Sequence, residues 1–502
     1  MKRIQNLIVL LIATALLGKV TIANESQNIT IIFAAEMPDI SNPNSGKYAE
    51  LQKLITDTKR SKTEAFFLFG GGSIGPSALS NLDRGSHIVD ILNSLEPDAM
   101  GIAKREFSYF EDELSLRSYE AAFPFVSSNI IDTRIDALPD GIASNALITK
   151  GKTKLGFISI VSERLIDEYL LKNIKVIDPI KATKAQSKIL KEAGADIVIV
   201  HYFYPYSFIS ELLQNNVIDF AFISNTLLPP SEIAKIAKQA RIFSIDSPGN
   251  ALVAEISIAE SPKVISAERI LLSNIASDPS VRSQVNEYQM RLDRLLDDRI
   301  GIWDGEFSTK RDVVRGSENA FVNYIVDTMR SIADADIALI NAGSIRGDRT
   351  YKKNTSITRK TIANELPFRP TLSIISIKGS DLLAALEVGF AGLDERRGSF
   401  PQVSGMRIRF DSKSPHGKRI KSVKINDQDI DIEKHYVLAT TDYLVNGGDG
   451  YSSLSKGEAL KSSSISGNIL ISDLIQRDIS LQGKLTSTVD NRLLDISSGN
   501  SL

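Results

Sequence analysis

Residues able to bind a phosphorylated compound gather in the second half of the chain. Arg311 and Arg315 stand four residues apart, and Arg346 follows Asn341 by five residues. A guanidinium presents a fork of N–H donors that matches phosphate oxygens, and an asparagine side chain can bond a sugar hydroxyl. Each stretch alone is also typical of solvated surface groups.

Two aromatic residues and a glycine-rich turn complete this set. Phe368 follows Leu366-Pro367, and Tyr443 stands six residues before Asp449 of Gly447-Gly448-Asp449-Gly450. Flat rings can stack on a base, and glycines let the backbone approach a ligand. The turn alone is more typical of ordinary structure.

A second candidate lies in the first half, where Lys104 and Arg105 stand between an apolar run and Phe107-Ser108-Tyr109. Adjacent cations could hold an anion. They could equally form a solvated turn.

Bulk properties limit the classes of function. A chain of 502 residues favours two domains. With 59 Lys and Arg against 61 Asp and Glu, the net charge of -2 gives no overall field for nucleic acid or an anionic membrane. Any anion binding must therefore be local.

The amino terminus predicts export. Met1-Lys2-Arg3 precedes an apolar run from Ile4 to Leu17, and small residues end at Ala23. This pattern is typical of a secretory signal peptide cleaved after Ala23, and the run is shorter than the ~20 residues that span a bilayer. Because the chain has no cysteine, disulfides and thiolate ligands are excluded. We expect a bacterial periplasmic protein with no stable membrane insertion after cleavage.

Hydrophobic patterning predicts an α/β fold. Continuous apolar runs at 29–33, 65–69, 155–160, 197–200 and 220–223 suit strands buried on both faces, and residues 180–193 and 231–239 have helical spacing. Residues 279–299 repeat apolar positions at helical spacing without Gly or Pro after Pro279, which predicts a connecting helix. Beyond it, helices at 320–333 and 379–389 mix with strands at 337–340, 406–410 and 436–439.

The second half resembles the C-terminal substrate-binding domain of the 5'-nucleotidase and UDP-sugar hydrolase family, which are secreted dinuclear metallophosphoesterases. The resemblance runs from Arg311 to about Leu454. It implies that the arginines hold phosphate, that Phe368 and Tyr443 sandwich a base, and that Asp449 holds ribose. Arg369-Pro370 departs from the family pattern, so the base is left open. The implied substrate-binding residues are Arg311, Arg315, Asn341, Arg346, Phe368, Tyr443 and Asp449.

The resemblance also implies a layered α/β/β/α metallophosphatase-like first domain whose loops hold two divalent metals. Here the metal ligands are replaced. The corresponding positions are Glu36 and Pro38 in the first loop, Gly72 in the second, Lys104 and Arg105 for the asparagine ligand and the catalytic histidine, and Asn225 and Leu227 in the fifth. His201 is the one possible remnant ligand, although a lone histidine is more often an ordinary hydrogen-bonded residue.

We therefore expect no metal cofactor and no intact catalytic residue. Because bound metal lowers the pKa of water from ~15.7 to ~7, its loss removes about 12 kcal/mol of nucleophile ionisation. The leading hypothesis is a secreted pseudoenzyme that binds a nucleotide or other phosphorylated small molecule, with Lys104 and Arg105 filling the vacated cleft. One alternative is a phosphoesterase that uses Glu36, Glu106 and His201. Another is an interaction protein with both sites relict, whose protein partners the sequence does not identify.

The resulting organisation has five segments. They are a signal peptide at 1–23, a degenerate metallophosphatase-like domain at 25–277, a connecting helix at 278–300, a 5'-nucleotidase-type α/β domain at 301–496 and a flexible tail at 497–502.

Overall fold

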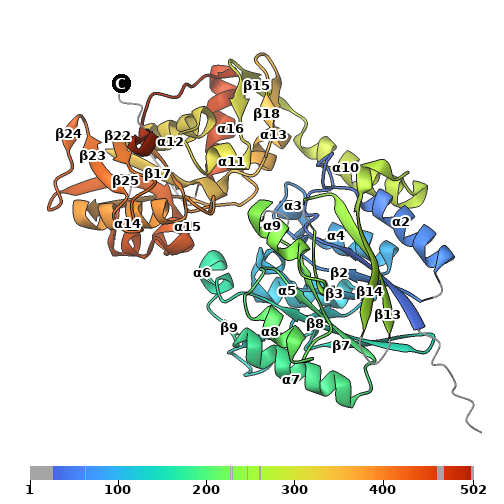
Figure 1. Ribbon diagram of the computed structural model, residues 1–502. Coiled ribbons are helices and arrows are strands. Elements are labelled where there is room, and N and C mark those ends of the chain that lie inside the picture. Colours follow the sequence, from blue (N-terminus) through green and yellow to red (C-terminus); the bar gives the residue numbers. More distant parts are fainter. Residues whose placement is uncertain are drawn as a thin grey trace, which may run out of the picture.

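The computed structural model describes residues 27–62, 64–225, 228, 230–245, 247–258, 262–460 and 469–498. Two domains lie against each other, with helix α10 (Pro279–Leu296) between them along the chain (Figure 1). The predicted signal peptide and residues 499–502 of the predicted tail lie outside the described residues. Among the described residues, no helix is long and apolar enough to cross a membrane.

Two stacked sheets form the centre of the first domain. The larger has the order β14-β13-β1-β2-β3-β4-β6, and the smaller β12-β11-β10-β8-β7. Phe33, Phe66, Phe157 and Phe222 pack between them. The strands are β1 (Gln27–Ala34), β2 (Ala65–Phe69), β3 (Ala99–Gly101), β4 (Phe125–Val126), β6 (Ile142–Ala143), β7 (Ala146–Lys150), β8 (Thr153–Ile160), β10 (Ile197–Tyr202), β11 (Phe220–Ile223), β12 (Ile242–Ser244), β13 (Asn250–Ile258) and β14 (Lys263–Leu271).

Helices cover the outer face of each sheet. Apolar side chains of α2 (Tyr48–Ser61), α4 (Ser86–Leu95) and α10 pack against the larger sheet. Those of α7 (Pro179–Glu192), α8 (Ile209–Gln214) and α9 (Pro230–Ala237) pack against the smaller one. The α/β/β/α layering predicted from the apolar runs and the resemblance is confirmed.

Helix α10 differs in extent from the predicted connecting helix at 278–300. The side chain of Asp278 caps it by accepting from the N–H groups of Ser280 and Val281, and the helix ends at Leu296. Residues from Arg299 onward form strand β15 (Arg299–Trp303) instead, because Arg299-Ile300-Gly301-Ile302-Trp303 alternates in exposure as a strand requires. Val281, Val285 and Leu292 are buried against the first domain, so α10 is part of its core.

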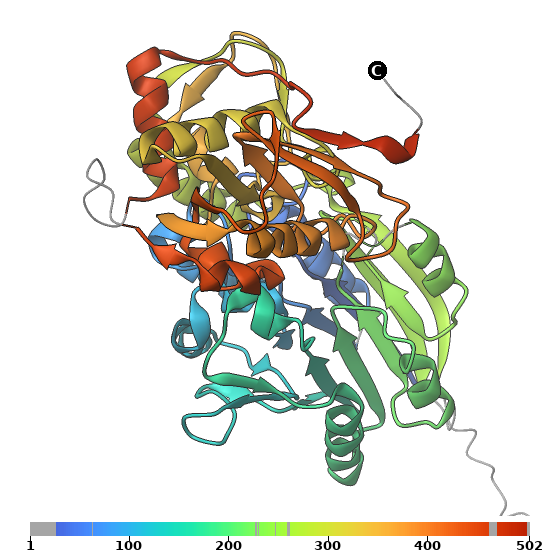
Figure 2. The same cartoon turned by 90° about the vertical axis from the view of Figure 1, so that its left-hand side faces the viewer.

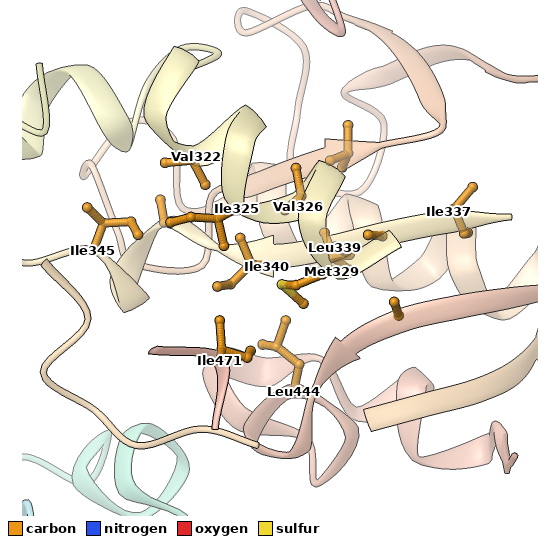
Figure 3. Packing of buried hydrophobic residues seen from close by; sticks show 14 of the residues in the cluster. Val322, Ile325, Val326, Met329, Ile337, Leu339, Ile340, Ile345, Leu444 and Ile471 are labelled. Atoms are coloured by element: carbon orange, nitrogen blue, oxygen red, sulfur yellow. The ribbon is translucent and has the colours of Figure 1, made fainter. Parts of the chain in front are cut away.

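A mixed sheet organises the second domain. Its order is β21 (Pro401–Ser404), β17 (Ile337–Asn341), β25 (His435–Thr441), β20 (Leu372–Lys378) and β26 (Glu458–Ala459). Val322, Ile325 and Met329 of α12 (Ala320–Ala333) pack on Leu339 and Ile340 of β17 (Figure 3). The predicted helix at 379–389 corresponds to α14 (Gly379–Ala391), and the predicted strand at 406–410 to β22 (Met406–Phe410).

The fold directs the candidate residues to the junction of the domains. Parallel strands β1, β2 and β3 end at one edge of their sheet, where the loops with Glu36, Gly72 and Arg105 begin. In Figure 1, α6 (Leu165–Tyr169), which follows β8, reaches from the first domain toward α15 (Asp442–Val445) of the second. Figure 2 shows the second domain resting on this end of the first.

Candidate functional site

A buried ion pair lies where the first domain's loops meet. Arg105 Nε lies 3.2 Å from Glu36 Oε2, and the Glu36 side chain is 3% exposed. Burial raises the pKa of Glu36, and the charges of Arg105 and Lys104 oppose that rise. The pair places a guanidinium directly against the Glu36 carboxylate of the first loop.

Gly72 makes room for this carboxylate. It has φ +73°, and a Cβ added there would lie 1.8 Å from Glu36 Oε1. Glu36 itself adopts a left-handed backbone with φ +60°. The glycine that replaces the expected bridging aspartate is therefore required by the side chain of Glu36.

Lys104 and Arg105 point to different partners, although they are neighbours. Lys104 Nζ lies 2.7 Å from Glu168 Oε2 and 5.4 Å from the ring centroid of Phe203. Burial lowers the pKa of Lys104, and the charge of Glu168 opposes that change. Arg105 faces the arginines of the second domain, as described below. Lys104 is instead paired with Glu168 of α6, so the two cations do not point into one cleft together.

Glu106 holds two loops together. Its Oε2 accepts from the N–H groups of Gly72 at 2.8 Å and Ala103 at 2.9 Å, and its Oε1 accepts from Ser73 at 2.8 Å and Ile74 at 3.3 Å. Four backbone N–H groups thus donate to the carboxylate. Burial is the largest influence on the pKa of Glu106 and raises it, whereas the bonds from Ser73, Gly72 and Ala103 lower it. This arrangement gives Glu106 a structural function.

His201 is a hydrogen-bonded core residue. Its Nδ1 lies 2.8 Å from Ser159 Oγ and its Nε2 lies 2.8 Å from Ser224 Oγ. Burial lowers the pKa of His201 to about 3, so the imidazole is neutral near pH 7. Both ring nitrogens have protein partners, which disfavours the predicted remnant-ligand function.

This burial predicts a loss of stability in acid. Unfolded His201 binds a proton below its ordinary pKa of 6.5, whereas folded His201 does so only near 3. The free energy of unfolding should fall by about 5 kcal/mol as the pH drops through that window, at about 1.4 kcal/mol for each pH unit. In chemical denaturation, His201→Gln should lose this slope and His435→Gln, at an exposed strand end, should keep it. Equal slopes in both variants would contradict the assignment.

The other positions that the resemblance assigns to metal ligands hold no histidine, cysteine or carboxylate. Pro38 is half-buried, Asn225 is buried, and Leu227 lies outside the described residues. In the part of the chain that the structure describes, no three His, Cys, Asp or Glu side chains are grouped so that they could hold a metal ion. With Arg105 on Glu36 and Lys104 nearby, the side chains present do not suit a pair of divalent cations.

Three arginines line the facing side of the second domain: Arg315 is buried, and Arg311 and Arg346 are half-buried. Burial, followed by the charges of Arg346 and Arg105, lowers the pKa of Arg311 to about 10. Arg315 is 5% exposed and donates to the carbonyl of Arg396 at 3.3 Å. Burial lowers its pKa, and the charges of Arg311 and Arg346 lower it further.

Arg346 stacks over an aromatic ring. Its guanidinium carbon lies 5.0 Å from the ring centroid of Phe368, a cation–π contact. Burial lowers the pKa of Arg346, and the charge of Arg105 is the next largest cause. The structure therefore brings together the predicted Arg311, Arg315, Arg346 and Phe368, and adds Arg105 from the other domain.

A hydrogen-bonded group surrounds Asp449. Asn341 Nδ2 donates to Asp449 Oδ2 at 2.6 Å, and the Tyr443 hydroxyl lies 3.0 Å from Asp449 Oδ1. The Asp449 N–H donates back to that hydroxyl at 3.0 Å. Strands β17 and β25 are parallel neighbours, so Asn341, which ends β17, and Tyr443, which follows β25, lie at the same edge of the sheet. The structure thus unites the predicted Asn341, Tyr443 and Asp449.

Helix α6 contacts this group, which sequence reasoning missed. The Tyr443 hydroxyl lies 3.0 Å from the carbonyl oxygen of Glu168, and Arg164 Nη1 lies 3.5 Å from Glu395 Oε2. Burial raises the pKa of Tyr169 to about 12, and the charges of Arg105 and Arg346 oppose that rise. No motif in Leu165-Ile166-Asp167-Glu168-Tyr169 marks the helix as part of a site, because its contacts are made across the fold.

Glu365 is a second residue that sequence reasoning missed. This buried carboxylate accepts from Thr309 Oγ1 at 3.0 Å and from the Gly347 N–H at 3.1 Å. It thereby ties the loop of Arg346 to the segment before Arg311. Burial raises the pKa of Glu365 to about 7. A glutamate directly before Leu366-Pro367-Phe368 was the available signal.

Glu365 predicts a pH dependence opposite to that of His201. The folded state keeps a proton on Glu365 up to about pH 7, whereas the ordinary pKa is 4.5. The free energy of unfolding should therefore fall by about 3 kcal/mol as the pH rises from 4.5 to about 7. Denaturation curves of Glu365→Gln should lack this decrease, while Glu306→Gln, at an exposed site, should retain it. The same decrease in Glu365→Gln would rule the carboxylate out as its source.

The family model and two of the curated relatives that match this chain are 5'-nucleotidases or nucleotide phosphoesterases. Residues 299–456 match the family described as 5'-nucleotidase, C-terminal domain. Human 5'-nucleotidase is 23% identical over 469 residues, covering 83% of this chain and 80% of that protein. The trifunctional nucleotide phosphoesterase YfkN of Bacillus subtilis is 30% identical over 184 residues, which are 35% of this chain and 12% of that protein.

Solved structures share the fold. A 5'-nucleotidase precursor from Thermus thermophilus superposes with a TM-score of 0.80 at 20% identity, covering 93% of this chain and 99% of that one. The sulfate thiohydrolase SoxB of Thermus thermophilus superposes with a TM-score of 0.70 at 15% identity, covering 89% of this chain and 83% of that one. Both matches extend over the two domains and α10.

Proposed function

The chain belongs to the 5'-nucleotidase family, and from that premise we propose that it binds a nucleotide or related phosphorylated compound without metal-dependent hydrolysis. Arg311, Arg315 and Arg346 hold the phosphate, Asn341 and Asp449 bond the sugar, and Phe368 and Tyr443 contact the base. The base itself is not specified, because Arg369-Pro370 departs from the family pattern. Support comes from the shared location of these side chains at the domain junction.

The observation that carries the non-hydrolytic part is the buried pair of Arg105 and Glu36. A guanidinium bonded to this carboxylate repels a divalent cation, and it stands where the resemblance expects the catalytic histidine. Gly72 supplies no carboxylate, and its replacement by any larger residue meets Glu36. Lys104 is neutralised by its pair with Glu168 and is not counted in this site. The donor chemistry thus favours an anion and disfavours two dications.

The alternative of an enzyme with unusual catalytic groups has less support. Glu106 is occupied by four backbone donors, and His201 is held between two serines with a pKa of about 3. Glu36 is paired with Arg105. Each candidate acid or base already has a structural partner within the protein.

The alternative of a relict interaction protein also has less support. A relict site has no reason to keep three arginines, one buried and two half-buried, at one junction, because withdrawing like charges from solvent without partners is unfavourable. The intact bonds among Asn341, Tyr443 and Asp449 likewise argue for a retained sugar site.

Binding is tested by calorimetric titration with AMP and with UDP-glucose in the presence of a chelator. Wild type should bind at least one of them, and Arg346→Ala should weaken that binding by tenfold or more, on the order of the loss of one charge-assisted contact. Arg409→Ala, which removes an exposed arginine of β22, should leave affinity unchanged. Absence of binding to both compounds by the wild type would refute the proposal.

Export is tested separately. When the full chain is produced in a bacterium, the mature protein should be recovered from the periplasm and begin at Asn24. Edman sequencing or intact mass determines the first residue. A cytoplasmic product that retains Met1 would contradict the proposed localisation.

A further inference from the structure

The arginines of the junction, of which Arg311 and Arg346 are half-buried, carry more positive charge than their protein partners balance. Among the described residues, the guanidinium groups of Arg311 and Arg346 make no ion pair within 4.0 Å and no hydrogen bond. Nε of Arg346 is buried without any partner. Charges that are partly withdrawn from solvent gain from a counter-ion, so these guanidinium groups suit an anion that is not part of the protein.

Arg105 extends this group across the domain interface. Its neighbour Lys104 is paired with Glu168, whose carbonyl oxygen accepts from the Tyr443 hydroxyl of the second domain at 3.0 Å. Arg105 also carries a charge that is among the causes that lower the pKa of Arg311, of Arg315 and of Arg346. It bonds Glu36 through Nε, and within the described chain neither Nη group has an acceptor. The two Nη groups are the end of the guanidinium that forks onto an oxyanion.

The nearby carboxylates do not neutralise these donors. Asp348 accepts from the backbone N–H of Arg311 at 3.0 Å and is exposed, and Asp449 is held by Asn341 and Tyr443. Among the described residues, Glu36 forms an ion pair with Arg105 alone, and its Oε1 is buried without a hydrogen bond. One direct carboxylate partner therefore serves this whole group of arginines.

We propose that Arg105 joins Arg311 and Arg346 in a metal-free site for the phosphoryl group of the ligand, so that one anion bridges the two domains. Glu36 is the internal counter-ion that orients Arg105 while the site is free of ligand. This inference rests on the proposed function, which concerns the class of ligand. It adds that the Arg105 guanidinium of the first domain, in place of a metal, is the positive partner of the phosphate.

Lys104 is the natural comparison for Arg105. It is adjacent in sequence and carries the same charge, but its Nζ is paired with Glu168 at 2.7 Å. Removing either charge changes the net charge equally. Only the loss of Arg105 removes donors from the proposed site.

The test measures the affinities for AMP, inorganic phosphate and adenosine by calorimetry in chelator, at low and moderate salt. Glu36→Gln should tighten AMP and phosphate binding about three- to tenfold, because it removes the competing carboxylate. The double variant Glu36→Gln with Arg105→Gln should bind both at least about tenfold more weakly than Glu36→Gln. It removes both members of the Glu36–Arg105 pair, so neither charge is left without its partner and folding is preserved. Lys104→Gln should change the affinities for AMP and phosphate by less than about twofold. Each of the three variants should likewise change the affinity for adenosine by less than about twofold.

The outcomes separate the two proposals. If AMP binds the double variant as tightly as Glu36→Gln, Arg105 is not part of the site and the inference fails while the proposed function stands. If phosphate binding depends on Arg105 but neither AMP nor UDP-glucose binds, the anion site stands and the proposed function fails. If wild type binds neither phosphate nor a nucleotide, both fail.

Discussion

Replacement of Gly72 by alanine should lower the free energy of unfolding by about 3 to 5 kcal/mol. The left-handed backbone at φ +73° contributes about 1 to 2 kcal/mol of this loss. The remainder arises because the new Cβ would lie 1.8 Å from Glu36 Oε1 and would displace a buried, paired carboxylate. Urea denaturation with a two-domain analysis measures the loss.

Gly417 supplies a matched control for this prediction. Its φ is +77°, and an added Cβ would meet no atom within 4 Å. Gly417→Ala therefore reports the backbone contribution alone and should cost about 1 to 2 kcal/mol. Combining Glu36→Ala with Gly72→Ala should recover the steric part, so that the losses of the single variants are not additive. Equal losses for Gly72→Ala and Gly417→Ala would show that Glu36 does not occupy the space beside Gly72.

Replacement of Arg105 by methionine should cost about 3 to 5 kcal/mol at neutral pH, because it leaves the Glu36 carboxylate buried and unpaired. The loss should shrink as the pH falls, since a protonated Glu36 needs no counter-ion. Adding Glu36→Gln should restore most of the stability. Thermal and chemical denaturation between pH 5 and 8 provide the measurement.

Lys104→Met is the control for the Arg105 variant. Its pair with Glu168 has side-chain exposures of 32% and 27%, so its loss should be about 1 kcal/mol or less. If the two single variants lose the same stability, or if Arg105→Met loses under about 1 kcal/mol, the pair of Arg105 and Glu36 is not the buried contact described here.

Much of the fold could be predicted because most of its buried strands appear in the sequence as short, continuous apolar runs. The runs at 65–69 and 220–223 correspond to β2 and β11, and the helix at 320–333 to α12. Such strands are apolar on both faces, which a sequence displays directly. Strand β14 was harder, because most of its side chains are exposed and no continuous apolar run marks it.

The candidate site could be predicted only in part. The stretches with Arg346, Phe368 and Asp449 follow one another at recognisable spacings, and the structure assembles them. The different orientations of Lys104 and Arg105 depend on Glu168 and Glu36, which are 64 and 69 residues away in the chain. Sequence adjacency carries no information about such directions.

The contact of α6 with the second domain was beyond prediction for the same reason. The carbonyl of Glu168 and the hydroxyl of Tyr443 are 275 residues apart. Glu365 was missed because burial, which raises its pKa, is a property of the assembled loops of Arg346 and Thr309. Both features depend on tertiary packing, so local patterns did not indicate them.

Phosphate release from AMP and UDP-glucose is the most direct test of the central claim. The purified full chain is assayed with added Mn²⁺ or Zn²⁺ and again with chelator, while binding of the same compounds is followed by calorimetry. We predict saturable binding that chelator does not weaken, together with no phosphate release above the protein-free control. Phosphate release that requires added metal and disappears with chelator would contradict the account.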